Sequence, residues 1–118
     1  DKLVLRNPDL DKVQQATIEE MRLQIDKYDD MIIDIFNKRM QVAEKIGRYK
    51  KENNITILQT KRWDEILNKR IKQGEKKQLS PEFITKIYRA IHQESINHQE
   101  KIMREVEKEM KQREKDQK

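Results

Sequence analysis

One apolar stripe limits what this chain can fold into. Between residues 18 and 53 apolar residues recur at steps of three, four and seven, at Ile18, Met21, Ile25, Tyr28, Ile32, Ile35, Val42, Ile46 and Tyr49. Such steps line one side of an α-helix, here one of about nine turns and roughly 50 Å. Two shorter helices of the same chain cannot cover that length, so the stripe predicts pairing with a partner chain.

The ends of this helix also have sequence signals. Thr17 and Glu20 fit a capping box at its start, with an earlier start left open. We expect Asn53-Asn54 to end the helix. The segment ITILQT at 55–60 breaks the periodicity with β-branched residues, which favours a loop.

Two further helices are expected after the loop. The first covers about residues 60–73, with Gly74 as its C-terminal stop. Ser80 as N-cap and Pro81 at the first helical position predict the start of the next, which runs through Ile102. The predicted fold is all-α, with three helices in the order long, short, long. We divide the chain into a linker or helical lead-in (1–16), a folded domain (17–104) and a charged helical tail (105–118).

Composition narrows the function classes. Of the 118 residues 34% are hydrophobic and 42% charged, which suits long helices that share a core better than one large spherical core. The sequence has no cysteine, which excludes disulfides and cysteine nucleophiles and agrees with a cytoplasmic location. The net charge of +5 comes from 27 basic residues interspersed with 22 acidic ones, so we expect a solvated helix surface, not nucleic-acid binding. No apolar stretch reaches membrane-spanning length, so no membrane partner is expected.

A polar constellation lies within the long helix, in NKRMQVAEKIGRYKKENN at 37–54. Arg39 and Lys50 are eleven residues apart, which brings both to within about 20° of one direction, about 16 Å apart along the axis. Gly47 lies between them and costs about 1 kcal/mol of helix propensity. It admits either a ligand or, more commonly, a neighbouring helix.

Arg22 precedes Arg39 by seventeen residues, about 25 Å along the helix and about 100° around it. It cannot reach the same site from the same straight helix. If the helix pairs antiparallel with its twin, Arg22 of one chain approaches the Arg39–Lys50 region of the other. The sequence therefore predicts an antiparallel homodimer.

Further polar residues lie on the later helices. Arg62 adds a cation at the start of the second helix, and Ser95 and Gln99 project from one face of the third because they are four residues apart. His92 and His98 are six apart and lie on different faces, so we interpret them as surface or packing residues.

The chain resembles the all-helical class (type II) of chorismate mutase. The resemblance covers roughly residues 18–102 without a gap, and MRLQIDKYDDMIIDIFNKRMQVAEKIGRYK, ILQTKRWDEIL and IYRAIHQESINHQ carry it. The first segment holds R-x-x-I-D-x-x-D, an arginine in NKRM and A-x-x-I-G-x-x-K. The resemblance implies an intertwined dimer of three-helix subunits with two sites, each using one arginine from the partner chain.

The resemblance also implies roles for the site residues. Arg22 of the partner subunit and Arg39 bind substrate carboxylates, and Lys50 and Gln99 donate hydrogen bonds to the ether oxygen of the breaking bond. Lys50, Gln99 and Arg39 are thus the expected catalytic residues. No cofactor or metal is implied, because the reaction is an intramolecular rearrangement.

Four more positions match the family's binding residues. Arg62 and Ser95 match positions that support binding near the carboxylates. Gln59 and Trp63 match positions around the substrate hydroxyl, where many members carry acidic residues. The indole of Trp63 cannot accept a hydrogen bond from a hydroxyl as a carboxylate does.

The implied function is conversion of chorismate, a dianion, to prephenate in aromatic amino-acid biosynthesis. Two alternatives remain open: an isochorismate pyruvate lyase on the same scaffold, and a non-catalytic helical interaction or regulatory module. The leading segment DKLVLRNPDLDKVQQ looks like a linker. We therefore expect a mutase domain from a longer bifunctional protein, fused to or associated with a DAHP synthase.

Overall fold

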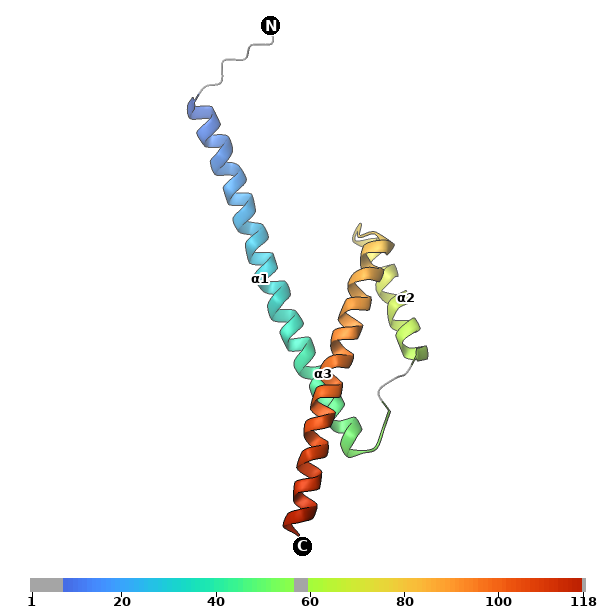
Figure 1. Cartoon of the computed structure of the whole chain (residues 1–118). Helices are drawn as coiled ribbons and strands as arrows, with labels where there is room; N and C mark the ends of the chain where they lie inside the picture. The colour runs from blue at the N-terminus through green and yellow to red at the C-terminus, as the bar shows by residue number, and fades with distance from the viewer. Residues whose placement is uncertain (1–7, 57–59, 118) are drawn as a thin grey trace. The chain divides into compact units, whose positions relative to one another are not determined.

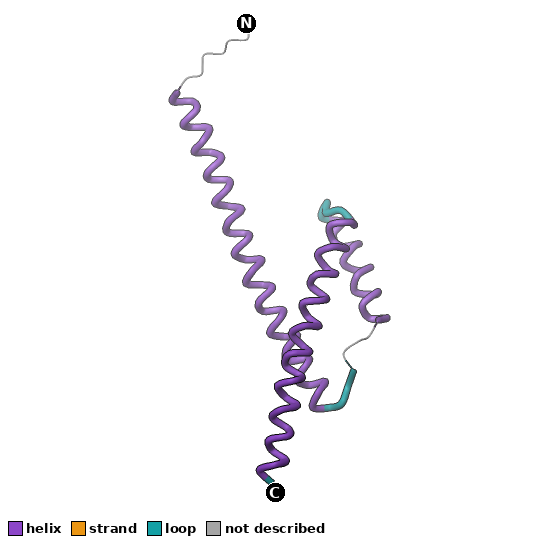
Figure 2. Tube along the Cα trace, in the orientation of Figure 1, coloured by secondary structure: helices purple, strands orange, loops and turns teal. Residues whose placement is uncertain are grey.

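The computed structural model describes residues 8–56 and 60–117. Within these ranges the chain forms three α-helices, α1 (Pro8–Glu52), α2 (Thr60–Lys76) and α3 (Pro81–Asp116), shown in Figure 1. The described residues contain no strand, as Figure 2 shows by colour. The predicted all-α fold and the order long, short, long are confirmed.

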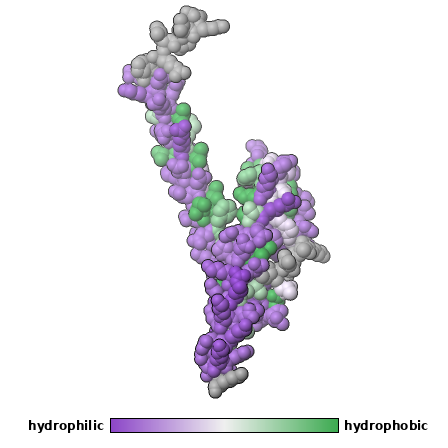
Figure 3. All heavy atoms as spheres, in the orientation of Figure 1, coloured by the Kyte–Doolittle hydropathy of each residue, from purple (hydrophilic) through white to green (hydrophobic). Residues whose placement is uncertain are grey.

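The chain divides into two units, residues 1–38 and residues 39–118. The described part of the first unit is the N-terminal portion of α1, and its apolar stripe is exposed. Exposed fractions run from 48% for Ile32 to 63% for Tyr28, with Met21, Ile25 and Ile35 between them. Figure 3 shows hydrophobic atoms gathered along this portion of α1.

The capping-box interpretation of Thr17 is wrong, and the earlier start that was left open is confirmed, as is the end of the helix. The helix begins at Pro8, and the Thr17 hydroxyl donates to the carbonyl oxygen of Val13 at 2.9 Å, as an interior residue does. The lead-in is therefore helical from residue 8. At the other end α1 stops at Glu52, and Asn54 takes a positive φ of 57° in the turn that follows.

The prediction that the second helix stops at Gly74 is wrong. Gly74 lies inside α2, which continues to Lys76, and the positive φ falls on Gln78 instead. The N–H of Leu79 donates to the Gly74 carbonyl at 2.8 Å and closes the turn. Gly74 is needed for space: a Cβ there would lie 2.6 Å from Cγ1 of Ile84 on α3.

The start of α3 is as predicted. The Ser80 side chain accepts a hydrogen bond from the N–H of Phe83 at 3.1 Å, and Pro81 takes the first helical position. The helix runs on through the charged tail to Asp116. Part of that tail packs, since Val106 is only 1% exposed. Glu109 also accepts from Arg48 of α1 at 3.0 Å.

Close packing of α1 on α3 explains the glycine in the first helix. A Cβ at Gly47 would lie 2.6 Å from Cγ2 of Ile102 and 2.8 Å from Cα of Gln99. Gly47 thus admits a neighbouring helix, the more common of the two uses considered above. Among the described residues from 39 onward, the buried apolar side chains are Met40, Ala43, Ile84, Ile91 and Val106. Within residues 8–56 and 60–117, no helix is both long enough and apolar enough to cross a membrane.

Candidate functional site

A cavity of about 400 Å³ lies between the C-terminal part of α1, α2 and α3. Five of the predicted site residues line it together: Arg39, Lys50, Arg62, Ser95 and Gln99. Its apolar wall consists of Val42, Ala43, Ile46 and Ile66. The volume falls in the range of small-molecule sites, and a mixed wall of this kind suits a ligand with an apolar ring and charged substituents.

Arg39 is held in place by α3. Its Nη1 donates to Oγ of Ser95 at 2.5 Å. Ser95 is buried, and its hydroxyl lies 2.9 Å from the carbonyl oxygen of Ile91, to which it donates. The hydroxyl therefore uses its single proton on the α3 backbone and its lone pair on Arg39. Ser95 acts as the anchor of the guanidinium within the cavity.

The cavity is strongly cationic. Arg39 and Lys50 come from the same face of α1, as their spacing predicted, and Arg62 comes from α2. No described lining residue is acidic. Three cations in one concave surface attract a small dianion, and arginine forks match the geometry of carboxylates.

Gln99 brings a carboxamide to the same cavity. Its Oε1 is buried and has no hydrogen-bond partner among the described residues. A buried polar group left without a protein partner is costly in a folded chain, and such groups are frequent at functional sites. Gly47 fixes the position of Gln99, because the glycine lets the α3 backbone at this residue come close to α1.

His92 also lines the cavity, although the sequence indicated only a surface or packing role. Its ring stacks on the indole of Trp63, with centroids 4.1 Å apart and planes inclined by 20°. Burial, and to a lesser degree the charge of Arg39, hold the pKa of His92 below its usual range. The missed signal was spacing: His92 lies three residues before Ser95 and seven before Gln99, so all three share one helix face.

The remaining predicted site residues lie elsewhere. Arg22 belongs to the first unit, where its exposed guanidinium pairs with Glu19 at 2.6 Å. Trp63 does not line the cavity of about 400 Å³, but its ring stacks on that of His92. Gln59 falls outside the described residues.

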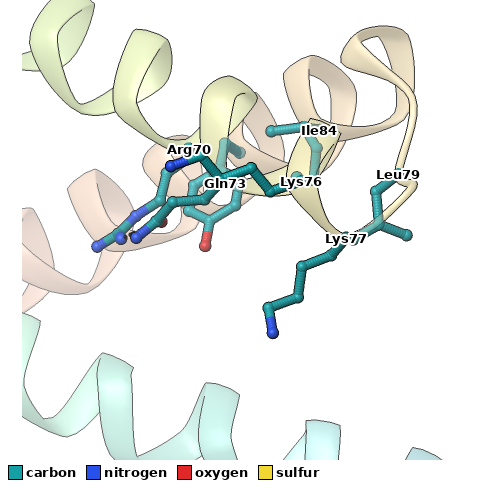
Figure 4. Close-up of a pocket in the computed structure, with 8 residues that line it drawn as sticks. Arg70, Gln73, Lys76, Lys77, Leu79 and Ile84 are labelled. Atoms are coloured by element: carbon teal, nitrogen blue, oxygen red, sulfur yellow. Dashed lines mark hydrogen bonds between the residues drawn. The ribbon is translucent and has the colours of Figure 1, made fainter.

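A second cavity, of about 510 Å³, lies near the turn between α2 and α3. Figure 4 shows labelled side chains that line it: Arg70, Gln73, Lys76, Lys77, Leu79 and Ile84. Here Nη1 of Arg70 donates to Oε1 of Gln73 at 2.7 Å, whereas Nε of Arg70 is buried and has no partner among the described residues. The first cavity gathers five of the predicted site residues, so it is the better candidate site.

Comparison with known proteins finds a family match over most of the chain. Residues 21–100, which include every predicted site residue, match the family description "Chorismate mutase type II". The chain belongs to the chorismate mutase type II family. The predicted family is thus confirmed.

A curated relative adds context. The bifunctional chorismate mutase/prephenate dehydratase of Buchnera aphidicola subsp. Acyrthosiphon pisum (strain APS) is 32% identical over 83 residues. The match covers 70% of this chain but only 22% of the relative. The chorismate mutase in that relative is combined with a dehydratase by name, so fusion to a DAHP synthase stays a prediction here.

Proposed function

We propose that the cavity of about 400 Å³ binds chorismate and converts it to prephenate. One observation carries the proposal: three cations, an unpaired carboxamide and an apolar wall meet in one concave surface. The cations match the two carboxylates of the substrate, and Val42 and Ile46 offer apolar contact to its ring. A helical interaction module does not require these cations and the carboxamide to converge on one cavity.

The rearrangement of chorismate requires the protein to position the substrate and to stabilise developing charge. In this rearrangement a carbon–oxygen bond of the enolpyruvyl ether breaks while a carbon–carbon bond forms in the same molecule. No proton transfer or nucleophile is needed. The site must hold the substrate folded, with the reacting carbons close together, and stabilise the negative charge that grows on the ether oxygen.

Lys50 and Gln99 are the proposed donors to that oxygen. Lys50 brings a positive charge to the cavity from α1, and Gln99 brings an amide N–H to it from α3. Arg39, anchored by Ser95, binds one carboxylate, and Arg62 supports the same end of the substrate. A fixed donor at the charge-developing oxygen is worth about 3–4 kcal/mol, or about 10²- to 10³-fold in rate.

The working form in this proposal is an intertwined antiparallel homodimer located in the cytoplasm. The support is the exposed stripe on α1, whose side chains from Ile18 to Ile35 keep about half or more of their surface in water. Contiguous apolar surface of this extent marks an interaction site. Burying it against a second copy would bring Arg22 of the partner to the cavity, where it would bind the second carboxylate.

The first test follows the loss of chorismate absorbance on addition of the purified chain. We expect turnover to prephenate, and a 10²- to 10³-fold loss of kcat in Lys50→Ala. Lys45→Ala is the matched control, because Lys45 is exposed on the same helix and does not line the cavity. Equal rates in both variants would remove Lys50 from the mechanism, and persistent chorismate with the wild-type chain would refute the proposed activity.

A mixing experiment tests the shared site. Arg22→Ala and Lys50→Ala are each expected to be inactive alone. In a heterodimer of the two, one site carries both defects and the other carries neither. After random exchange of subunits, the mixture should recover about a quarter of the wild-type activity. No recovery, with exchange verified by differently tagged chains, would place Arg22 in its own subunit's site or outside the site.

A further inference from the structure

His92 lines a cavity whose charged side chains supply hydrogen-bond donors but no acceptors. The charged groups that face it are Arg39 and Lys50 from α1 and Arg62 from α2. All three side chains donate hydrogen bonds and accept none. Glu65 of α2 does not line this cavity but the adjoining one of about 340 Å³. A ligand hydroxyl that must donate its proton therefore finds few acceptors here.

Other acceptors in the cavity are used or buried. The Ser95 hydroxyl accepts from Arg39. Oε1 of Gln99 is buried, and the N–H of the same carboxamide is assigned above to the ether oxygen. The indole N–H of Trp63 only donates. The ring nitrogens of His92, by contrast, make no hydrogen bond with any described residue.

Trp63 fixes the orientation of the imidazole. The two rings stack nearly parallel, 20° apart, with centroids 4.1 Å from each other. This contact covers one face of the imidazole, while His92 also lines the cavity. The stack also limits rotation of the ring, so that its nitrogens are presented in one plane.

The charge state of His92 suits an acceptor. Burial, with the charge of Arg39 as a second cause, favours the neutral form by lowering the pKa. A neutral imidazole has one nitrogen that accepts a hydrogen bond and one that donates. Near neutral pH His92 therefore supplies a neutral acceptor beside three cations.

We propose that His92, held flat against Trp63, accepts the hydrogen bond of the ring hydroxyl of chorismate and selects the hydroxylated substrate. The inference rests on the proposed function, since it names a specificity residue for that reaction. His92 and Trp63 act as a pair, in which the indole positions the imidazole and the imidazole contacts the substrate.

The test compares chorismate with an analogue that lacks the ring hydroxyl. His92→Phe keeps an aromatic ring for the stack but has no acceptor. We expect its kcat/KM to fall about tenfold on chorismate and to change less than about twofold on the analogue. His92→Gln, which regains an acceptor, should return to within about threefold of the wild-type chain on chorismate. His98→Phe is the matched control, because His98 pairs with Glu94 at 2.8 Å outside the cavity and should leave both rates unchanged.

A pH profile of the wild-type chain gives a readout that needs no variant. Protonation removes the acceptor, so kcat/KM on chorismate should fall as the pH drops through the pKa of His92, below about 6.5, while the analogue shows no such step. An equal loss on both substrates in His92→Phe, or the same pH step with both, would assign His92 a structural role and overturn the proposal. Absence of chorismate turnover by the wild-type chain would instead refute the proposed function. The wild-type chain is therefore assayed before any variant.

Discussion

Replacing Gly47 by alanine tests whether the close approach of α1 and α3 positions the site. The added Cβ would lie 2.8 Å from Cα of Gln99 and 3.0 Å from its carbonyl oxygen. The first distance is roughly 0.7 Å short of the ~3.5 Å at which carbon atoms pack. Because these are backbone atoms, α3 itself must move, and Gln99 moves with it.

The two consequences differ in size. Overpacking costs about 1–3 kcal/mol, but alanine regains about 1 kcal/mol of helix propensity, so the net loss of stability stays within about 2 kcal/mol. A displacement of about 1 Å at a reacting group costs about 10²-fold in rate. We therefore expect kcat to fall 10- to 100-fold in Gly47→Ala while the chain remains folded.

The assay is chorismate turnover, with thermal unfolding measured by circular dichroism on the same samples. Gly74→Ala is the matched control, since its Cβ would meet the side chain of Ile84, at 2.6 Å, away from the candidate site. That side chain can rotate, so activity should stay within about twofold. Wild-type kcat in Gly47→Ala would show that close contact at Gln99 does not position the donor, and the reasoning would fail.

Further predictions concern anchoring, pH and substrate. Ser95→Ala removes the acceptor that holds Arg39, so KM for chorismate should rise about tenfold with a smaller change in kcat; an unchanged KM in steady-state kinetics would contradict the anchor. Since the pKa of His92 is lowered, the unfolded chain binds more protons just below pH 6.5, and the free energy of unfolding should fall as the pH drops through that window; thermal melts of His92→Phe should lack this slope. The hydrogen bond from Arg48 lowers the pKa of Glu109, so its contribution to stability is present above about pH 4.5 and lost below it, and Glu109→Gln should remove that acid-side change without affecting kcat. Offered isochorismate, the chain should release no pyruvate, and pyruvate detected enzymatically would identify a lyase instead.

Local sequence signals predicted some helix ends correctly and others wrongly. Ser80-Pro81 and Asn53-Asn54 act within one turn of the backbone, so they predicted the start of α3 and the end of α1 correctly. Thr17 failed as a cap because nothing local stops a helix from beginning earlier, at Pro8. Gly74 failed as a stop because its role is close contact with Ile84, from a different helix, which no local pattern reports.

The sequence by itself determined the helical class, the apolar stripe on α1 and the shared face of Arg39 and Lys50, since all three follow from the periodicity of one helix. Only the tertiary structure decided which groups from different helices meet. It placed Ser95 under Arg39, brought Gln99 against Gly47 and set His92 on Trp63. Those contacts depend on how helices pack, and packing is set by the joint shape of side chains far apart in the sequence.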